Sequence, residues 1–260
     1  MVASFYPLAE AARQVGGDEV RVENLTPPGA EPHDLELTAS QVADIQDADV
    51  VLVLGQGFQP AVEKAAAGRR GTVELLRALG PAADDSDDPH VWLDPVLFAA
   101  VVDQVAAALG RAEPARRPAF SAGADAYKAQ LAALDGDYRS GLSDCARREI
   151  LTSHEAFGRL AERYGLTQES IAGLSPETEP EPDHLAELAD LVRRRGATTI
   201  FTETLVSPRV ADALARETGA RTQVLDPLES LSREDVRAGA TYLSVMRANL
   251  AKLRAALGCR

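Results

Sequence analysis

The chain has 260 residues, 45% of them hydrophobic, and its 40 acidic side chains outnumber 27 basic ones to give a formal net charge of −13. This length and composition indicate a globular protein with one large domain or two of ordinary size. The negative charge disfavours nucleic acid as a partner and is compatible with a cationic ligand. No apolar run approaches the roughly 20 residues of a membrane span, and the first residues lack the apolar stretch of a signal peptide.

Strand-like and helix-like segments alternate in the first part of the chain. The pattern predicts a strand at 2–7, a helix at 8–17, a strand at 20–27, a helix at 38–48 and a strand at 49–55. The last strand contains VVLVL, a continuous apolar run that is typical of a parallel strand covered by helices on both faces.

The pattern continues with a helix and a short strand over 59–79. Asp94 and Pro95 are typical of an N-cap followed by the first residue of a helix, which we expect to continue to Gly110. We therefore predict an N-terminal α/β lobe over residues 1–113.

Residues 114–143 are helical in pattern, and such a helix would be about 40 Å long at 1.5 Å per residue. We expect it to link two lobes. From residue 144 the alternation of strands and helices resumes and ends in a helix at about 233–257, which predicts a C-terminal α/β lobe over 144–260. The predicted fold class is α/β, with two lobes that each contain a parallel sheet flanked by helices, one long backbone helix between them, and the ligand site in the cleft between the lobes.

Three histidines share one sequence context. His33, His90 and His154 each lie in or next to a loop that we expect to follow a strand, where ligands bind in such folds. Three imidazoles need a carboxylate or a water to complete a tetrahedral zinc site. We choose Asp226, which follows an apolar strand, as this ligand, and Glu203 as an alternative ligand or as a partner that orients a ligand.

Other readings of these residues stay open. A single loop histidine is more often structural or solvated, the three histidines lack the close spacing of a helical metal motif, and we expect His184 to be solvated. The sequence contains no GxSxG, HExxH, P-loop or GxGxxG motif, so no catalytic residues are predicted.

The acidic residues and the cysteines each allow two interpretations. Asp84, Asp85, Asp87 and Asp88 form either a solvated loop or a loop that gathers metal ions near the site. Cys145 and Cys259 are far apart and outside any CxxC motif, so they form a long-range disulfide or remain two thiols.

Five segments together resemble the metal-binding solute-binding proteins of bacterial ABC importers, and in particular their zinc-uptake (ZnuA-like) branch. In chain order these are GAEPHDLELTASQVADIQDADVVLVLG, DPHVWLDP, TSHEAFGRLAERYG, IFTETLVSPRVADALARETGA and VLDPLES. With the opening strand and the closing helix, the resemblance covers nearly the whole chain.

The resemblance implies two α/β lobes joined by one long helix, with a single ion between them. It assigns His33 and His90 as ligands from the first lobe, and His154 and Asp226 as ligands from the second. Manganese-type members tend to have Glu at the position of His154, whereas zinc-type members tend to have His, and three imidazoles with a carboxylate suit zinc better than manganese. Many zinc-type members also have a long histidine-rich acidic loop, of which only DDSDD is present here.

The resemblance also implies where the protein works and with what. We expect a periplasmic protein, or a lipid-anchored extracellular one if a removed leader carried a lipobox, that delivers zinc to an ABC permease. A metallochaperone is a further candidate partner. We do not expect nucleic acid as a partner, and we expect the protein to be a monomer. An extracytoplasmic location favours the disulfide between Cys145 and Cys259.

The expected function is that of a high-affinity zinc carrier without enzymatic activity, because a shell of four protein ligands has no open position for an activated water. The alternatives are a manganese or iron carrier, a zinc hydrolase in which Asp226 or Glu203 acts as the base, and an adhesin-like protein whose metal is structural.

Overall fold

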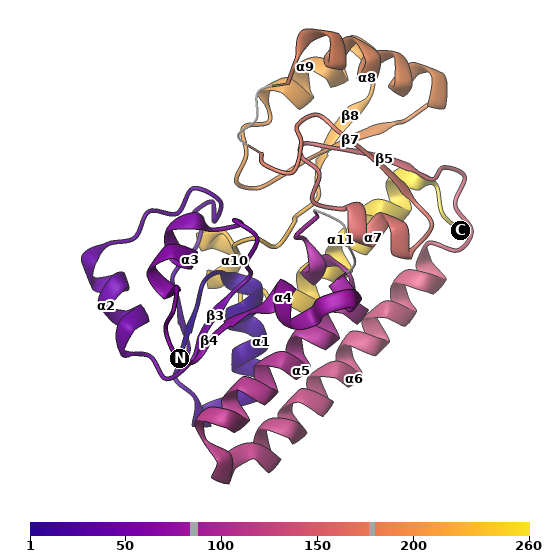
Figure 1. Cartoon of the computed structure of the whole chain (residues 1–260). Helices are drawn as coiled ribbons and strands as arrows, with labels where there is room; N and C mark the ends of the chain where they lie inside the picture. The colour runs from indigo at the N-terminus through magenta and orange to yellow at the C-terminus, as the bar shows by residue number, and fades with distance from the viewer. Residues whose placement is uncertain (84–87, 177–179) are drawn as a thin grey trace. The chain divides into compact units, whose positions relative to one another are not determined.

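The computed structural model describes residues 1–83, 88–176 and 180–260. Within these ranges the chain forms two compact units, which are described separately (Figure 1). The first unit comprises Met1–Ala133 and Leu228–Tyr242, and the second comprises Leu134–Pro227 and Leu243–Arg260. The long helix α6 (Arg117–Gly141) begins in the first unit and ends in the second, so it joins the two lobes as predicted.

The first unit contains a parallel four-stranded sheet. Its strands have the order β2-β1-β3-β4 and are β1 (Val2–Ala3), β2 (Glu23–Asn24), β3 (Val51–Val53) and β4 (Thr72–Glu74). Its helices are α1 (Tyr6–Gly16), α2 (Ala39–Asp47), α3 (Pro60–Ala66), α4 (Leu75–Leu79), α5 (Pro95–Ala112) and α10 (Arg233–Arg237). Buried Val51 and Val53 of the predicted apolar strand pack with Ile45 of α2 and Val62 of α3.

Local sequence signals explain where two of these helices begin. Thr38 and Gln41 form a reciprocal capping box at the start of α2. The Asp94 carboxylate accepts hydrogen bonds from the backbone N–H groups of Val96 and Leu97, and Pro95 is the first residue of α5, as predicted. By length and hydropathy α5 could cross a membrane, but in this unit it packs against α1.

The second unit repeats the strand order of the first. Its sheet has the order β6-β5-β7-β8, with β5 (Glu149–Thr152), β6 (Thr167–Ser170), β7 (Thr199–Thr202) and β8 (Arg221–Val224), all parallel. The helices are α7 (Gly158–Arg163), α8 (Pro182–Arg195), α9 (Arg209–Thr218) and α11 (Tyr242–Leu257), which starts at the last residue of the first unit. In Figure 1, α8 and α9 lie on one side of this sheet and α7 lies on the other.

The division of the chain differs from the predicted boundaries at residues 228–242. We expected this segment in the C-terminal lobe, but hydrogen bonds attach it to the first unit. The Gly29 N–H donates to the carbonyl of Leu231 over 2.9 Å, and the Tyr242 hydroxyl donates to the carbonyl of Trp92 over 2.5 Å. The predicted helix at 233–257 is also interrupted, because Gly239 takes a left-handed conformation (φ 73°) between α10 and α11.

The predicted disulfide between Cys145 and Cys259 is confirmed. Both cysteines belong to the second unit, where the bond attaches the end of the chain to the segment that follows α6. The backbone N–H of Arg147 donates to the carbonyl of Leu257 beside this bond.

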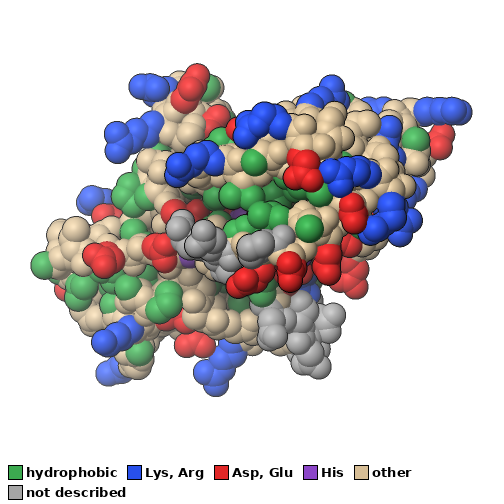
Figure 2. Space-filling view, turned by 90° about the horizontal axis from the view of Figure 1, so that it is seen from above, with side chains coloured by type: hydrophobic (Ala, Val, Ile, Leu, Met, Phe, Trp, Pro, Cys, Tyr) green, Lys and Arg blue, Asp and Glu red, His purple; other side chains and the backbone are tan. Residues whose placement is uncertain are grey.

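Basic side chains are dispersed over the face drawn in Figure 2. Among the described residues visible there, Lys and Arg lie in separate groups with Asp and Glu between them and form no continuous basic surface.

Candidate metal centre

In the first unit, His33 lies in the loop between β2 and α2. Its backbone N–H donates to the Glu31 carboxylate over 3.3 Å, and its ring packs on Phe58 with the ring centroids 4.4 Å apart. The side chain is 12% exposed. The loop therefore holds the imidazole at the edge of the protein interior without removing it from solvent.

His90 lies deeper in the same unit. It precedes the short helical turn Val91–Leu93, and the helix α4 and the turn after it lie between β4 and His90. Its side chain is 0% exposed and contacts Trp92, with the ring centroids 5.1 Å apart. One oxygen of Asp88, Oδ1, lies 2.9 Å from the His90 backbone N–H and 2.7 Å from ring atom Nδ1.

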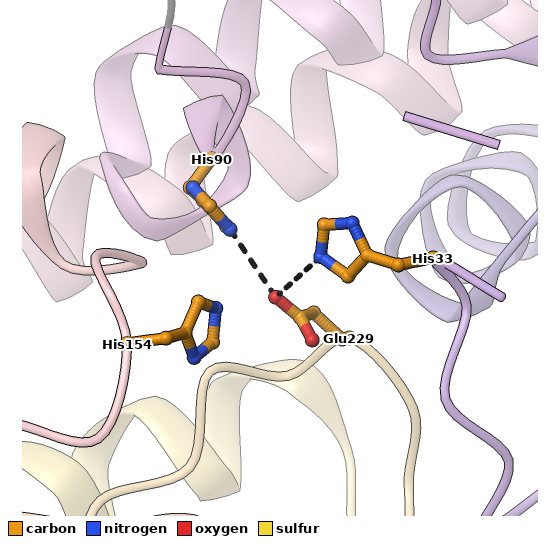
Figure 3. Close-up of side chains that lie close together, drawn as sticks. All are labelled: His33, His90, His154 and Glu229. Carbon is orange, nitrogen blue, oxygen red and sulfur yellow. Dashed lines mark ion pairs between the residues drawn. The ribbon is translucent and has the colours of Figure 1, made fainter. Parts of the chain in front are cut away.

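A buried carboxylate faces both imidazoles. Oε1 of Glu229 lies 3.2 Å from Nε2 of His90 and 3.6 Å from Nε2 of His33, and the Glu229 side chain is 1% exposed (Figure 3). The ligand atoms offered by the three residues all lie within 4.8 Å of one another. Two ligands that are each about 2.0–2.1 Å from a tetrahedral ion lie about 3.3–3.4 Å apart. The two measured distances lie on either side of this value, so these donors fit zinc.

The loop that carries Glu229 is held against the loop that leads to His33. Ser230 Oγ donates to the carbonyl of Pro27 over 3.3 Å, next to the bond between Gly29 and Leu231. Leu228, directly before Glu229, is fully buried and has a left-handed backbone (φ 59°), which is uncommon for a residue other than glycine. This turn sets the direction in which the Glu229 carboxylate points.

The carboxylates also control the charge of His90. Burial favours the neutral ring, but hydrogen bonds and charges from Asp88 and Glu229 outweigh burial and raise the pKa of His90 above its ordinary value. A ligand of this kind must lose its proton before it can bind a metal ion. Acid therefore competes with metal at this residue.

In the second unit, His154 lies directly after β5 and Glu203 directly after the neighbouring strand β7. Oε1 of Glu203 accepts the His154 backbone N–H over 3.2 Å, and Oε2 lies 2.7 Å from ring atom Nδ1. The carbonyl of His154 accepts hydrogen bonds from Thr152 Oγ1 (2.7 Å) and Gln168 Nε2 (2.9 Å). Both side chains of the His154–Glu203 pair are buried, so these contacts fix the orientation of the ring.

The comparison with known proteins decides the family. Residues 1–256 match the family described as ZnuA, the periplasmic component A of the zinc-uptake complex. This chain belongs to the ZnuA family. It is 37% identical over 98% of its length to the zinc-binding lipoprotein AdcA of Streptococcus pneumoniae, and it spans 55% of that protein. It is 35% identical over 99% of its length to the high-affinity zinc uptake system protein ZnuA of Bacillus subtilis, and it spans 87% of that protein.

The fold is also that of a ZnuA-like domain. The chain is similar to the crystal structure of the Zn(II)-bound ZnuA-like domain of Streptococcus pneumoniae AdcA, with a TM-score of 0.83 and 37% identity. The similarity covers 98% of this chain and 97% of that domain. About half of the length of the full AdcA protein is thus matched by this member of the ZnuA family.

The structure differs from the sequence-based assignment in the carboxylate beside the histidines. The group of potential ligands among the described residues contains Glu229 and does not contain Asp226. Asp226 lies three residues earlier, at the end of the second unit, where its backbone N–H and carbonyl are both hydrogen-bonded to the side chain of Asn249. Sequence reasoning missed Glu229, although VLDPLES offered it as a second acid.

The remaining candidate residues divide into three cases. Asp84, Asp85 and Asp87 lie outside the described residues, whereas Asp88 contacts His90. Glu203 contacts His154. His184 is partly buried, and its Nε2 lies 2.8 Å from the carbonyl of Ser170 on β6.

Proposed function

We propose that this member of the ZnuA family is the extracytoplasmic zinc-binding protein of an ABC importer, which captures Zn²⁺ and delivers it to the permease. One observation carries the proposal: the Glu229 carboxylate lies 3.2 Å and 3.6 Å from two imidazole Nε2 atoms, at the spacing of neighbouring ligands in a tetrahedral zinc shell. The names of its relatives, a zinc-binding lipoprotein and a zinc uptake protein, support the same cargo.

We assign the zinc ligands as His33, His90, His154 and Glu229. Glu229 takes the role for which the sequence suggested Asp226. The assignment of His154 rests on its position after a central strand and on the contact of its Nδ1 with Glu203, so that Nε2 would be the ligand atom. Glu203 then acts as the partner that orients His154 and not as a ligand.

The donor set favours zinc over manganese or iron as the cargo. Three neutral imidazoles with one carboxylate suit Zn²⁺, whereas Mn²⁺ favours oxygen ligands and more of them. A carrier is also favoured over a hydrolase. Four protein ligands leave no open position for an activated water, and both oxygens of Glu203 are in contact with His154, which makes it a poor candidate for a base.

The cellular context follows from the cargo. We propose a periplasmic or lipid-anchored protein that works as a monomer with an ABC permease, with a metallochaperone as a second candidate partner and no nucleic acid. The disulfide in the second unit supports an oxidising compartment. Cell fractionation that places the native protein in the cytoplasm would contradict this location.

Metal analysis of protein purified without added metal, followed by competition between zinc and manganese, tests the cargo. We expect one zinc ion per chain. A large excess of manganese should not displace this zinc. His33→Ala and His154→Ala should each lose zinc affinity, whereas the control His184→Ala should keep it, because His184 bonds to a backbone carbonyl of β6. Manganese in the purified protein, or equal affinity in all three variants, would contradict the proposal.

A further inference from the structure

We propose that Asp88 is a positioning residue for metal capture: it holds His90 in the tautomer with the proton on Nδ1 and so directs Nε2 toward the ion. This inference rests on the proposed zinc-binding function. It gives Asp88 a role different from that of a general ion-gathering residue in the acidic stretch. It also predicts an effect on the ring of His90 that can be measured without zinc.

One oxygen of Asp88 contacts two of the three nitrogens of His90. Asp88 Oδ1 lies 2.9 Å from the backbone N–H and 2.7 Å from ring atom Nδ1. An ionised carboxylate only accepts hydrogen bonds, so Nδ1 must carry its proton to bond with it. A second carboxylate, Glu229, faces Nε2, but its Oε1 lies 3.2 Å away, whereas Asp88 Oδ1 lies 2.7 Å from Nδ1. The closer acceptor therefore places the single proton of a neutral ring on Nδ1 and the lone pair on Nε2.

Burial makes this orientation costly to lose. The His90 side chain is 0% exposed, and its ring packs beside the aromatic rings of Trp92 and Phe58, with centroid distances of 5.1 Å and 6.4 Å. Without Asp88, the buried Nδ1–H group would lose this acceptor, or the proton of the ring would move from Nδ1 to Nε2. The ring would then offer Nε2 to a metal ion for only part of the time.

The second unit has a similar pair of contacts, made by a different residue. Glu203 accepts the backbone N–H of His154 with Oε1 and contacts ring atom Nδ1 with Oε2. Asp88 is two residues from its histidine, where a bond to the backbone N–H also defines a common local turn, but Glu203 is 49 residues away. A local turn therefore does not explain the arrangement in the second unit. Control of the imidazole is the feature that both pairs share.

Asp88 differs from a freely solvated acidic residue in its burial and its contacts. Its side chain is 14% exposed, and Oδ1 is in contact with two nitrogens of one residue. A carboxylate that collects ions from solution needs free oxygens and exposure. Pro89, between Asp88 and His90, further restricts the backbone on both sides of the bond.

The test uses Asp88→Ala, the isosteric Asp88→Asn and the control Asp47→Ala. Asp47 is exposed at the end of α2, so the control removes the same charge from the same unit without touching a histidine. Two properties are measured in each protein: zinc affinity by competition with a chelator, and the histidine tautomers by ¹⁵N NMR of the metal-free protein about two pH units above the ordinary histidine pKa.

We expect wild-type His90 to be in the Nδ1–H form. In Asp88→Ala, His90 should no longer be held in this form, and zinc affinity should fall by about 10–100-fold. The ¹⁵N NMR signals of His154 should stay unchanged. Asp88→Asn keeps an accepting oxygen and should restore most of the affinity, and Asp47→Ala should match the wild type.

The inference would be overturned by wild-type His90 in the Nε2–H form, a result that does not depend on whether any variant folds. Equal tautomers and affinity in Asp88→Ala and wild type would also overturn it, as would an equal loss of affinity in Asp47→Ala. A wild-type protein that fails to bind zinc would refute the proposed function instead, and the tautomer of His90 would still decide the role of Asp88.

Discussion

Oε1 of Glu229 lies 3.2 Å from Nε2 of His90, although the two residues are 139 positions apart in the chain. The segment 228–242, which carries Glu229, belongs to the first unit although it lies between the two segments of the second unit in sequence. The Glu229 carboxylate and the His90 imidazole are therefore in contact within one compact unit. Together with His33 they form part of the proposed zinc site.

Glu229→Gln should lower zinc affinity more than the roughly 10–100-fold typical of a residue that only orients a ligand. The substitution keeps the shape of the side chain but removes the anionic donor. Asp226→Asn is the matched control, since it changes an acid three residues away and leaves intact the backbone bonds to Asn249. Competition titration measures both, and a larger loss in Asp226→Asn would support the sequence-based assignment instead.

Glu203→Gln should lower zinc affinity by about 10–100-fold, less than His154→Ala. The amide cannot accept with both of its terminal atoms, so one of the two bonds to His154 is lost. Chelator competition gives the two affinities. If Glu203→Gln removed binding as completely as His154→Ala, Glu203 would be a ligand.

Zinc affinity should fall as the pH is lowered, and the fall should begin above the ordinary histidine value of 6.5. The pKa of His90 is raised because Asp88 and Glu229 outweigh the effect of burial, so protons compete with zinc already at pH values where an ordinary histidine is neutral. Affinities measured across this range in buffers that do not bind zinc check the sign. An affinity that stays constant to well below pH 6.5 would contradict the prediction.

The double variant Cys145→Ser/Cys259→Ser should be less stable by about 2–4 kcal/mol, because the bond closes a long loop. The cysteines are 114 residues apart in sequence and both lie in the second unit. Denaturant unfolding of metal-free protein measures the change, with reduced wild type as a second sample. Zinc affinity of the folded variant should remain near that of the wild type. Equal stability of the oxidised wild type and the variant would be the contrary result.

The sequence predicted the fold class and the candidate histidines for the same physical reason. Apolar runs such as VVLVL indicate parallel strands, and a parallel sheet brings the loops at the carboxyl ends of its strands to one edge. His154 and Glu203 follow adjacent strands and do meet. This part of the candidate site depends only on the order of strands, which the sequence pattern carries.

The carboxylate at the first-unit histidines could not be predicted in this way. Asp226 and Glu229 lie in one short segment, and the choice between them depends on the left-handed turn at Leu228 and on the bonds of Ser230 and Leu231 to the loop at 27–29. Neither feature has a signal in the sequence pattern, since a positive φ is not expected of leucine. For the same reason, residues 228–242 were assigned to the wrong lobe.

The most direct test of the account is a crystal structure of the zinc-loaded protein with anomalous diffraction data at the zinc edge. We expect one zinc ion bound by Nε2 of His33, His90 and His154 and by the carboxylate of Glu229, at about 2.0–2.2 Å. An ion bound through Asp226 in place of Glu229, or an ion that has no contact with His90, would contradict it.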